Sequence, residues 1–169
     1  MSIGTTSTVQ ISQLVALLDS AFDGADWDSL LGNLQTTVAE DWEWIPDGGS
    51  RSIRDIVRHV GGSKFMYENS AFGDGSLTWD HPLVSGEAYT RDFVDAAKWL
   101  RDGHHRLREV ALALTDADLT REVLMNWGDH ESAYFVFSIM AHHDVYHAGE
   151  INLLRSLHHR DDRWAHERE

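Results

Sequence analysis

The chain has 169 residues, a formal net charge of −14 and no cysteine. This length suits one domain with a substantial core, and the lack of cysteine excludes disulfides, zinc–thiolate sites and a cysteine nucleophile. The acidic excess opposes binding to phosphate backbones, so we expect no nucleic-acid partner. The sequence shows no apolar run long enough to span a bilayer and no secretory signal, so we also expect no membrane partner and a cytoplasmic location.

Apolar residues recur at helical spacing in four segments, which predicts four main helices. The first covers about residues 8–34, and Gly24 is expected to kink or interrupt it. A turn rich in Pro and Gly at residues 46–49 separates it from the second helix. Ser52 and Asp55 have the spacing of a capping box, so the second helix is expected to begin there.

The second half of the chain contains a long connection and the remaining two helices. Residues 72–86 include several glycines and a proline, and are expected to form a long loop. The third helix is predicted for about residues 87–114 and the fourth for about residues 132–158. Between them, residues 121–127 could form a short extended piece.

Four long amphipathic helices in one small chain predict an all-α fold, a single four-helix bundle over residues 1–169. The long second connection is able to cross one end of the bundle, which favours an up-down-down-up order. Residues 1–7 and 160–169 lie outside the helical pattern and are expected to be flexible tails.

Three of the eleven histidines fall on apolar helix faces. His143 and His147 are four residues apart, so a helix directs both imidazoles to one point, and His59 on the second helix could supply a third ligand. Three imidazoles suit a divalent metal with open coordination positions. Satisfied core histidines are the alternative, and from spacing alone the two readings are about equal. The remaining histidines that lie among charged residues are expected to be solvated: His104, His105, His158, His159 and His166.

Glu150 follows His147 by three residues, on nearly the same helical face. Its carboxylate could orient a metal ligand, bind the metal itself or act as a catalytic base. A salt bridge to Arg155 or a solvated position is an equally weighted alternative. We take Glu150 as the candidate catalytic residue, to be tested by Glu150→Gln.

Three segments resemble the DinB-like superfamily of four-helix metalloproteins: Trp42–Ser50, Ser52–His59 and His143–Ile151. The family's last motif is usually His-x-x-x-His-Arg-Gly-Gln. This chain matches both histidines and the glycine, whereas Ala148 and Glu150 replace the Arg and the Gln. The resemblance implies a four-helix bundle over nearly the whole chain, with a divalent ion on His59, His143 and His147.

The family includes thiol S-transferases that use bacillithiol or mycothiol, and mycothiol-dependent maleylpyruvate isomerase is a relative. The resemblance therefore implies transfer of a low-molecular-weight thiol to an electrophilic small molecule, or a related isomerisation or elimination. Imidazole ligands suit Zn, Ni, Fe or Co without choosing among them. The alternatives are a hydrolase that uses metal-bound water and a non-catalytic stress protein that binds a metal or a small ligand. A further alternative is a bundle that acts through dimerisation, and a homodimer is compatible with each reading.

Overall fold

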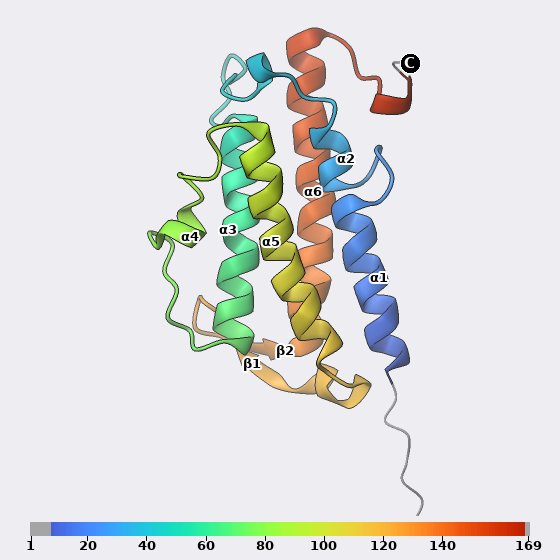
Figure 1. The fold of residues 1–169 in the computed structure, drawn as a ribbon, viewed down its shortest axis with the longest axis vertical. Coiled ribbons are helices and arrows are strands. Elements are labelled where there is room, and N and C mark those ends of the chain that lie inside the picture. Colours follow the sequence, from blue (N-terminus) through green and yellow to red (C-terminus); the bar gives the residue numbers. More distant parts are fainter. Residues whose placement is uncertain (1–7, 168–169) are drawn as a thin grey trace, which may run out of the picture.

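Long helices lie side by side in the computed structural model, which describes residues 8–167 (Figure 1). They are α1 (Val9–Asp23), α3 (Ile53–Phe72), α5 (Phe93–Leu112) and α6 (Ala133–His159), and the short α2 (Leu30–Leu34) extends the line of α1. In Figure 1 the chain rises through α1 and α2, descends through α3, descends again through α5 and rises through α6. The fold is mostly helical, as the sequence predicts.

The first predicted helix is interrupted at Gly24, as expected. The Gly24 N–H still donates to the Ser20 carbonyl at 3.1 Å, but a Cβ at Gly24 would lie 2.3 Å from the same oxygen. Glycine is therefore needed where α1 ends. The Ser29 hydroxyl then caps α2 by accepting from the Gly32 N–H at 3.1 Å, so helical structure begins again.

The predicted starts of two helices are confirmed. At α3, Ser52 and Asp55 form the capping box, in which the Ser52 N–H donates to the Asp55 carboxylate at 2.9 Å. At α6, the Ser132 hydroxyl accepts from the Phe135 N–H at 3.2 Å. In both caps the bonded residues lie within one helical turn, so the caps can be recognised from the sequence.

The predicted start of the third helix was wrong. The helix α5 begins at Phe93 and not near Glu87, because the Asp92 side chain caps it by accepting from the Asp95 N–H at 3.0 Å. The preceding connection also contains a short helix, α4 (Pro82–Ser85), inside the segment predicted to be loop. The 20-residue span of α5 is therefore shorter than the span of apolar periodicity suggested.

A small hairpin joins α5 to α6 at the lower end of Figure 1. The predicted extended piece contains β1 (Glu122–Leu124), which pairs antiparallel with β2 (His130–Ser132), a strand that was not predicted. Three short 3-10 helices complete the described elements: η1 (Ala39–Asp41), η2 (Asp116–Thr120) and η3 (Ala165–Glu167).

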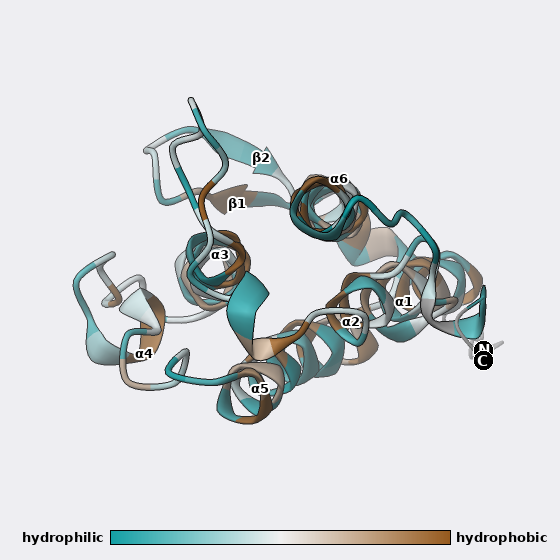
Figure 2. Ribbon diagram, turned by 90° about the horizontal axis from the view of Figure 1, so that it is seen from above, coloured by the Kyte–Doolittle hydropathy of each residue, from teal (hydrophilic) through white to brown (hydrophobic). Residues whose placement is uncertain are grey.

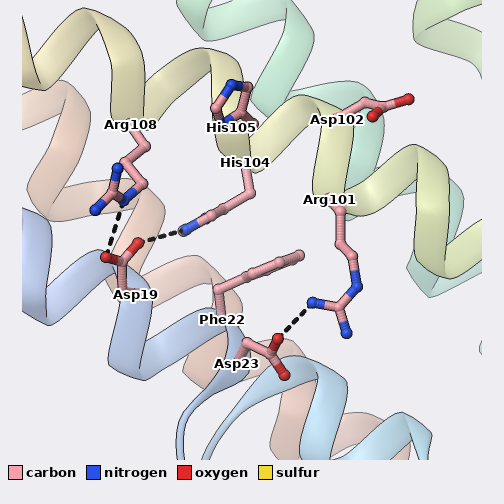
Figure 3. A pocket seen from close by; sticks show the side chains of 8 residues that line it. All are labelled: Asp19, Phe22, Asp23, Arg101, Asp102, His104, His105 and Arg108. Carbon is pink, nitrogen blue, oxygen red and sulfur yellow. Dashed lines mark hydrogen bonds and ion pairs between the residues drawn. The ribbon is translucent and has the colours of Figure 1, made fainter.

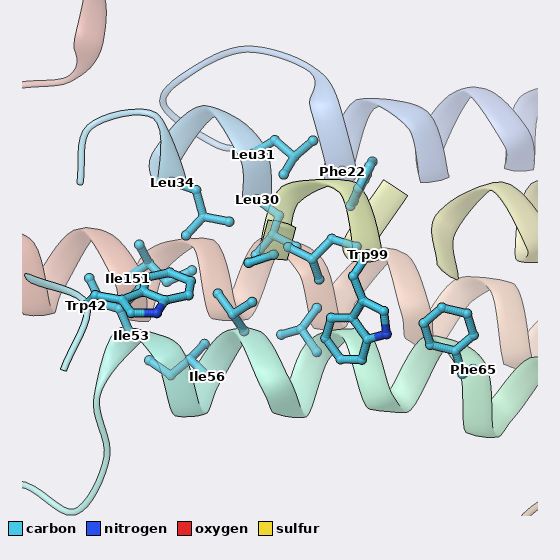
Figure 4. Close-up of a cluster of buried hydrophobic side chains, with 14 of the residues drawn as sticks. Phe22, Leu30, Leu31, Leu34, Trp42, Ile53, Ile56, Phe65, Trp99 and Ile151 are labelled. Carbon is cyan, nitrogen blue, oxygen red and sulfur yellow. The ribbon is translucent and has the colours of Figure 1, made fainter. Parts of the chain in front are cut away.

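Seen from above, α3, α5, α6 and the α1–α2 pair surround a common centre (Figure 2). Apolar side chains fill one end of this centre in a cluster that includes Trp42, Ile53 and Ile151, together with Phe65 and Trp99 (Figure 4). A second cluster joins α1, α5 and α6 towards the hairpin. These clusters fix α3 against α6, the two helices that carry the candidate site.

Gly61 in α3 permits a close approach to α5. A Cβ at Gly61 would lie 2.1 Å from the indole of Trp99, which is buried and donates to the Leu83 carbonyl at 2.9 Å. We expect Gly61→Ala to lower the free energy of unfolding by about 1–3 kcal/mol, because the indole would have to move. Gly149→Ala is the matched control, since its Cβ would meet open space within a helix and should stabilise by about 0.4–1 kcal/mol. Urea unfolding of both variants measures the contrast, and equal midpoints would refute it.

Only part of each predicted tail is described. Residues 1–7 lie outside the described residues, whereas the chain after α6 continues to η3, where the His166 backbone N–H and ring bind the Asp26 carboxylate at 3.0 and 2.6 Å. The flexibility of this segment stays a prediction. Within residues 8–167, no helix combines the length and apolar character that crossing a bilayer requires.

Candidate metal centre

The three histidines on apolar faces converge between α3 and α6. His59 comes from α3, while His143 and His147 are one turn apart on α6. The Nε2 atom of His143 lies 3.0 Å from that of His59 and 3.2 Å from that of His147. One ring nitrogen from each residue falls within 4.8 Å of the others. Residues 84 positions apart in the chain are thus brought to one point.

The spacing of these nitrogens fits a single divalent ion. Metal–imidazole bonds of about 2.0–2.1 Å place neighbouring ligand nitrogens about 2.9–3.4 Å apart, depending on the bond angle. Both separations, 3.0 and 3.2 Å, fall in this interval. Three imidazoles that present the same nitrogen to one another cannot all be satisfied by N–H···N bonds, because each such bond needs one donor and one acceptor. A cation would satisfy three lone pairs together.

The hydrogen bond to Glu150 determines which ring nitrogen of His147 carries the proton. The Glu150 Oε2 lies 2.5 Å from His147 Nδ1, so this nitrogen carries the proton and Nε2 keeps its lone pair. Burial lowers the pKa of His59 and of His147, in His147 against the opposing effect of Glu150. Burial, helped by the two neighbouring imidazoles, lowers the pKa of His143 to about 3. All three rings are therefore neutral at pH 7, the form that binds metal.

Arg51 is the part of the site that sequence reasoning missed. Its Nη2 lies 2.5 and 2.7 Å from the two carboxylate oxygens of Glu150. Burial raises the pKa of Glu150, but the hydrogen bonds from Arg51 and His147 outweigh it and hold that pKa below its usual value. Arg155, the partner considered from the sequence, is the wrong one, since it is fully buried and donates to Asn152 at 2.6 Å.

The sequence positions of Arg51 and Glu150 relative to the histidines could have indicated that the two residues meet. The helices α3 and α6 run in opposite directions in Figure 1 and share the histidine cluster. Moving eight residues back from His59 therefore leads to the same end of the bundle as moving forward along α6 from His143. This antiparallel register brings Arg51 to Glu150.

An ion pair lies inside the bundle beside the histidines. The Lys64 Nζ and the Asp144 Oδ2 are 2.6 Å apart, and both side chains are 0% exposed. Burial raises the pKa of Asp144, while the charge and hydrogen bond of Lys64 act against this rise. Because Asp144 follows His143 directly on α6, the pair joins the inner face of α3 to the turn that carries two of the candidate ligands.

The centre is open on one side. His147 is buried and His143 is half-buried, whereas His59 is exposed. The exposed ring of Tyr146 stands edge-on to His147, with ring centroids 5.0 Å apart. Three histidine ligands, of which only His59 is exposed to solvent, would leave coordination positions for exogenous ligands, as in catalytic metal sites.

A family model of the DinB superfamily matches residues 23–151. The chain belongs to the DinB superfamily. The matched region includes His59, His143, His147 and Glu150, and therefore contains the whole candidate centre. Comparison with curated proteins gives no match.

In this member of the DinB superfamily, His104 is not the solvated residue that its charged neighbours suggested. It is 7% exposed and stacks on Phe22, with ring centroids 4.1 Å apart. Burial is the main cause that lowers the pKa of His104 to about 4. The residue packs here because α1 lies against this face of α5, a contact that local composition does not reveal.

A pocket of about 520 Å³ opens between α1 and α5 beside His104 (Figure 3). Several of its polar groups interact with one another: Asp19 bonds His104 and Arg108, and Asp23 pairs with Arg101. These contacts already engage Arg101, Arg108 and Asp19, and the candidate function is assigned to the histidine cluster between α3 and α6.

Proposed function

We propose that this DinB-superfamily protein is a metal-dependent enzyme that transfers a low-molecular-weight thiol to an electrophilic small molecule, or catalyses a related isomerisation or elimination. His59, His143 and His147 would hold the divalent ion, which is Zn, Ni, Fe or Co. The observation that carries the proposal is the convergence of three neutral imidazoles, 3.0 and 3.2 Å apart at Nε2, on a centre that is open at His59. A purely structural zinc site is usually closed by four protein ligands.

A divalent ion at this centre would supply Lewis-acid chemistry that lowers the pKa of a thiol or of water. The chain has no cysteine, so a thiol nucleophile has to come from a cosubstrate. The exposed His59 would give such a molecule access to the centre. The same centre with water as the nucleophile would make a hydrolase.

Glu150 is better supported as a positioning residue than as a base. It accepts from His147 Nδ1, the ring nitrogen that does not take part in the cluster, and this bond fixes the tautomer that presents the Nε2 lone pair. Arg51 engages both carboxylate oxygens and holds the group ionised. The pair would therefore act on the metal through His147.

The proposal is tested by metal analysis of the purified protein, followed by assays of an electrophile with a panel of low-molecular-weight thiols. Thiol conjugation that stops on chelation, and returns when one metal ion is restored, is the expected result. Turnover of the electrophile at the same rate without any thiol would favour the hydrolase. Metal binding without turnover would favour a non-catalytic binding protein.

Glu150→Gln separates positioning from base catalysis. If Glu150 orients His147, the variant should bind metal about 10–100-fold more weakly, and Arg51→Gln should shift the affinity in the same direction. If Glu150 is a base, turnover should fall roughly 100-fold with metal affinity unchanged. Competition with a chromophoric chelator gives the affinity. Glu109→Gln is the control, because the Glu109 side chain is exposed on α5 and pairs with the exposed His105.

A further inference from the structure

A second cluster of metal-ligand chemistry lies at the other end of α6. Asp41 Oδ1 is 2.7 Å from His158 Nδ1 and 2.6 Å from His159 Nε2. One ligand atom from each residue falls within 4.8 Å of the others. Both histidines were expected from the sequence to be solvated, and His159 is exposed whereas His158 is half-buried. Each reaches a carboxylate 117 or 118 positions away in the chain.

The cluster is held in place by its surroundings. Asp41 is 1% exposed, and its Oδ2 accepts from the Val38 N–H at 2.9 Å, which directs Oδ1 towards the imidazoles. The His158 ring is stacked on Trp44, with ring centroids 4.5 Å apart. Asp41 and His158 are therefore each positioned by a contact other than the bond between them.

The charge and burial of Asp41 favour a cation at this cluster. Among the described residues its side chain is bonded to the Val38 N–H and the two imidazoles, and it forms no ion pair with a lysine or an arginine. A buried carboxylate without a full opposite charge is costly. The last turn of α6 adds the negative end of the helix dipole, which also favours a cation.

We propose that Asp41, His158 and His159 form a second divalent-metal site, separate from the cluster of His59, His143 and His147. Two imidazoles and one carboxylate suit Zn²⁺ or a similar first-row ion. The ion would replace the imidazole–carboxylate hydrogen bonds of 2.6 and 2.7 Å and widen these separations to about 2.9–3.4 Å. A cavity of about 300 Å³ lined by His159 provides space for water ligands. His147 and His158 are separated by about 16 Å along the helix, at 1.5 Å per residue, so one ion cannot serve both sites.

The second ion would have a structural effect. It would tie η1, and the connection that carries Trp42 and Trp44, to the end of α6. This connection leads from α2 into α3 and contains Arg51. It therefore joins the second site to the start of α3, the helix that bears His59.

Zinc titration of a His143→Ala/His147→Ala variant isolates the proposed second site from the first. Full-length protein with this double substitution should bind one equivalent of Zn²⁺ in competition with a chelator, and its thermal midpoint should rise on zinc addition. Adding His158→Gln and His159→Gln should weaken this binding at least about 100-fold and abolish the rise. His105→Gln with His166→Gln, which removes two exposed histidines elsewhere, should leave both readouts unchanged.

Each outcome bears on one site. Absence of zinc binding in the His143→Ala/His147→Ala protein, or binding that survives replacement of His158 and His159, overturns the proposal. If the four-fold variant fails to fold by circular dichroism, His159→Gln alone decides, because it leaves the stack of His158 on Trp44 intact. Failure of the proposed enzymatic function would leave this titration unaffected.

Discussion

Replacement of His147 by alanine is expected to remove one equivalent of bound metal from the histidine cluster and to leave the helical content unchanged. His147 is the ligand with the most complete support, since it is buried and its Nδ1 donates to Glu150 at 2.5 Å. Its loss should weaken metal binding by more than the roughly 10–100-fold that loss of an orienting partner costs. The fold should persist because the apolar clusters on either side do not depend on an ion.

Metal content by elemental analysis and circular dichroism measure the two parts of this result. His142→Ala is the matched control, because His142 is exposed on the same turn of α6 and lies outside the cluster. Full metal content in His147→Ala protein would remove the residue from the site. Loss of helicity would instead make the ion part of the fold.

Lys64→Met should cause the largest loss of stability, about 3–5 kcal/mol, because it leaves the Asp144 carboxylate buried without its partner. For a chain of this length this corresponds to a thermal midpoint lowered by roughly 6–20 °C. The second lysine of the chain provides the control, since Lys98 is exposed on α5 and Lys98→Met should change stability by less than about 0.5 kcal/mol. Urea denaturation of both variants gives the comparison.

A double substitution shows whether the charge itself is the cause. Lys64→Met with Asp144→Leu replaces both partners by apolar groups and should recover most of the lost stability. If Lys64→Met costs no more than Lys98→Met, the carboxylate is neutralised in another way and the argument from burial fails. If the double variant is as unstable as the single one, packing rather than charge accounts for the loss.

The features that the sequence predicted well are those encoded over a single helical turn. Ser52 and Ser132 mark helix starts with bonds to residues three positions ahead, and the i, i+4 spacing places His143 and His147 on one face. The inward face of α3 likewise identified His59 as the residue to join them.

The features that escaped prediction depend on which helices pack together and in what register. Arg51 meets Glu150 because α3 and α6 are antiparallel, and His104 is buried because α1 covers it. The sequence does not indicate that Lys64 is buried, because a lysine is rarely buried without a partner and that partner lies 80 positions away. Periodicity shows which face of a helix points inward, but it does not name the residue opposite.

The ligands of both proposed sites are distributed unevenly over the bundle. α3 and α6 supply His59, His143 and His147, and η1 with α6 supplies the second set, whereas neither α1 nor α5 contributes a ligand to either. Local opening of the native protein should therefore respond to metal in only part of the molecule. Amide hydrogen exchange in α3 and α6 should slow on metal loading, while α1 should continue to fray at its original rate.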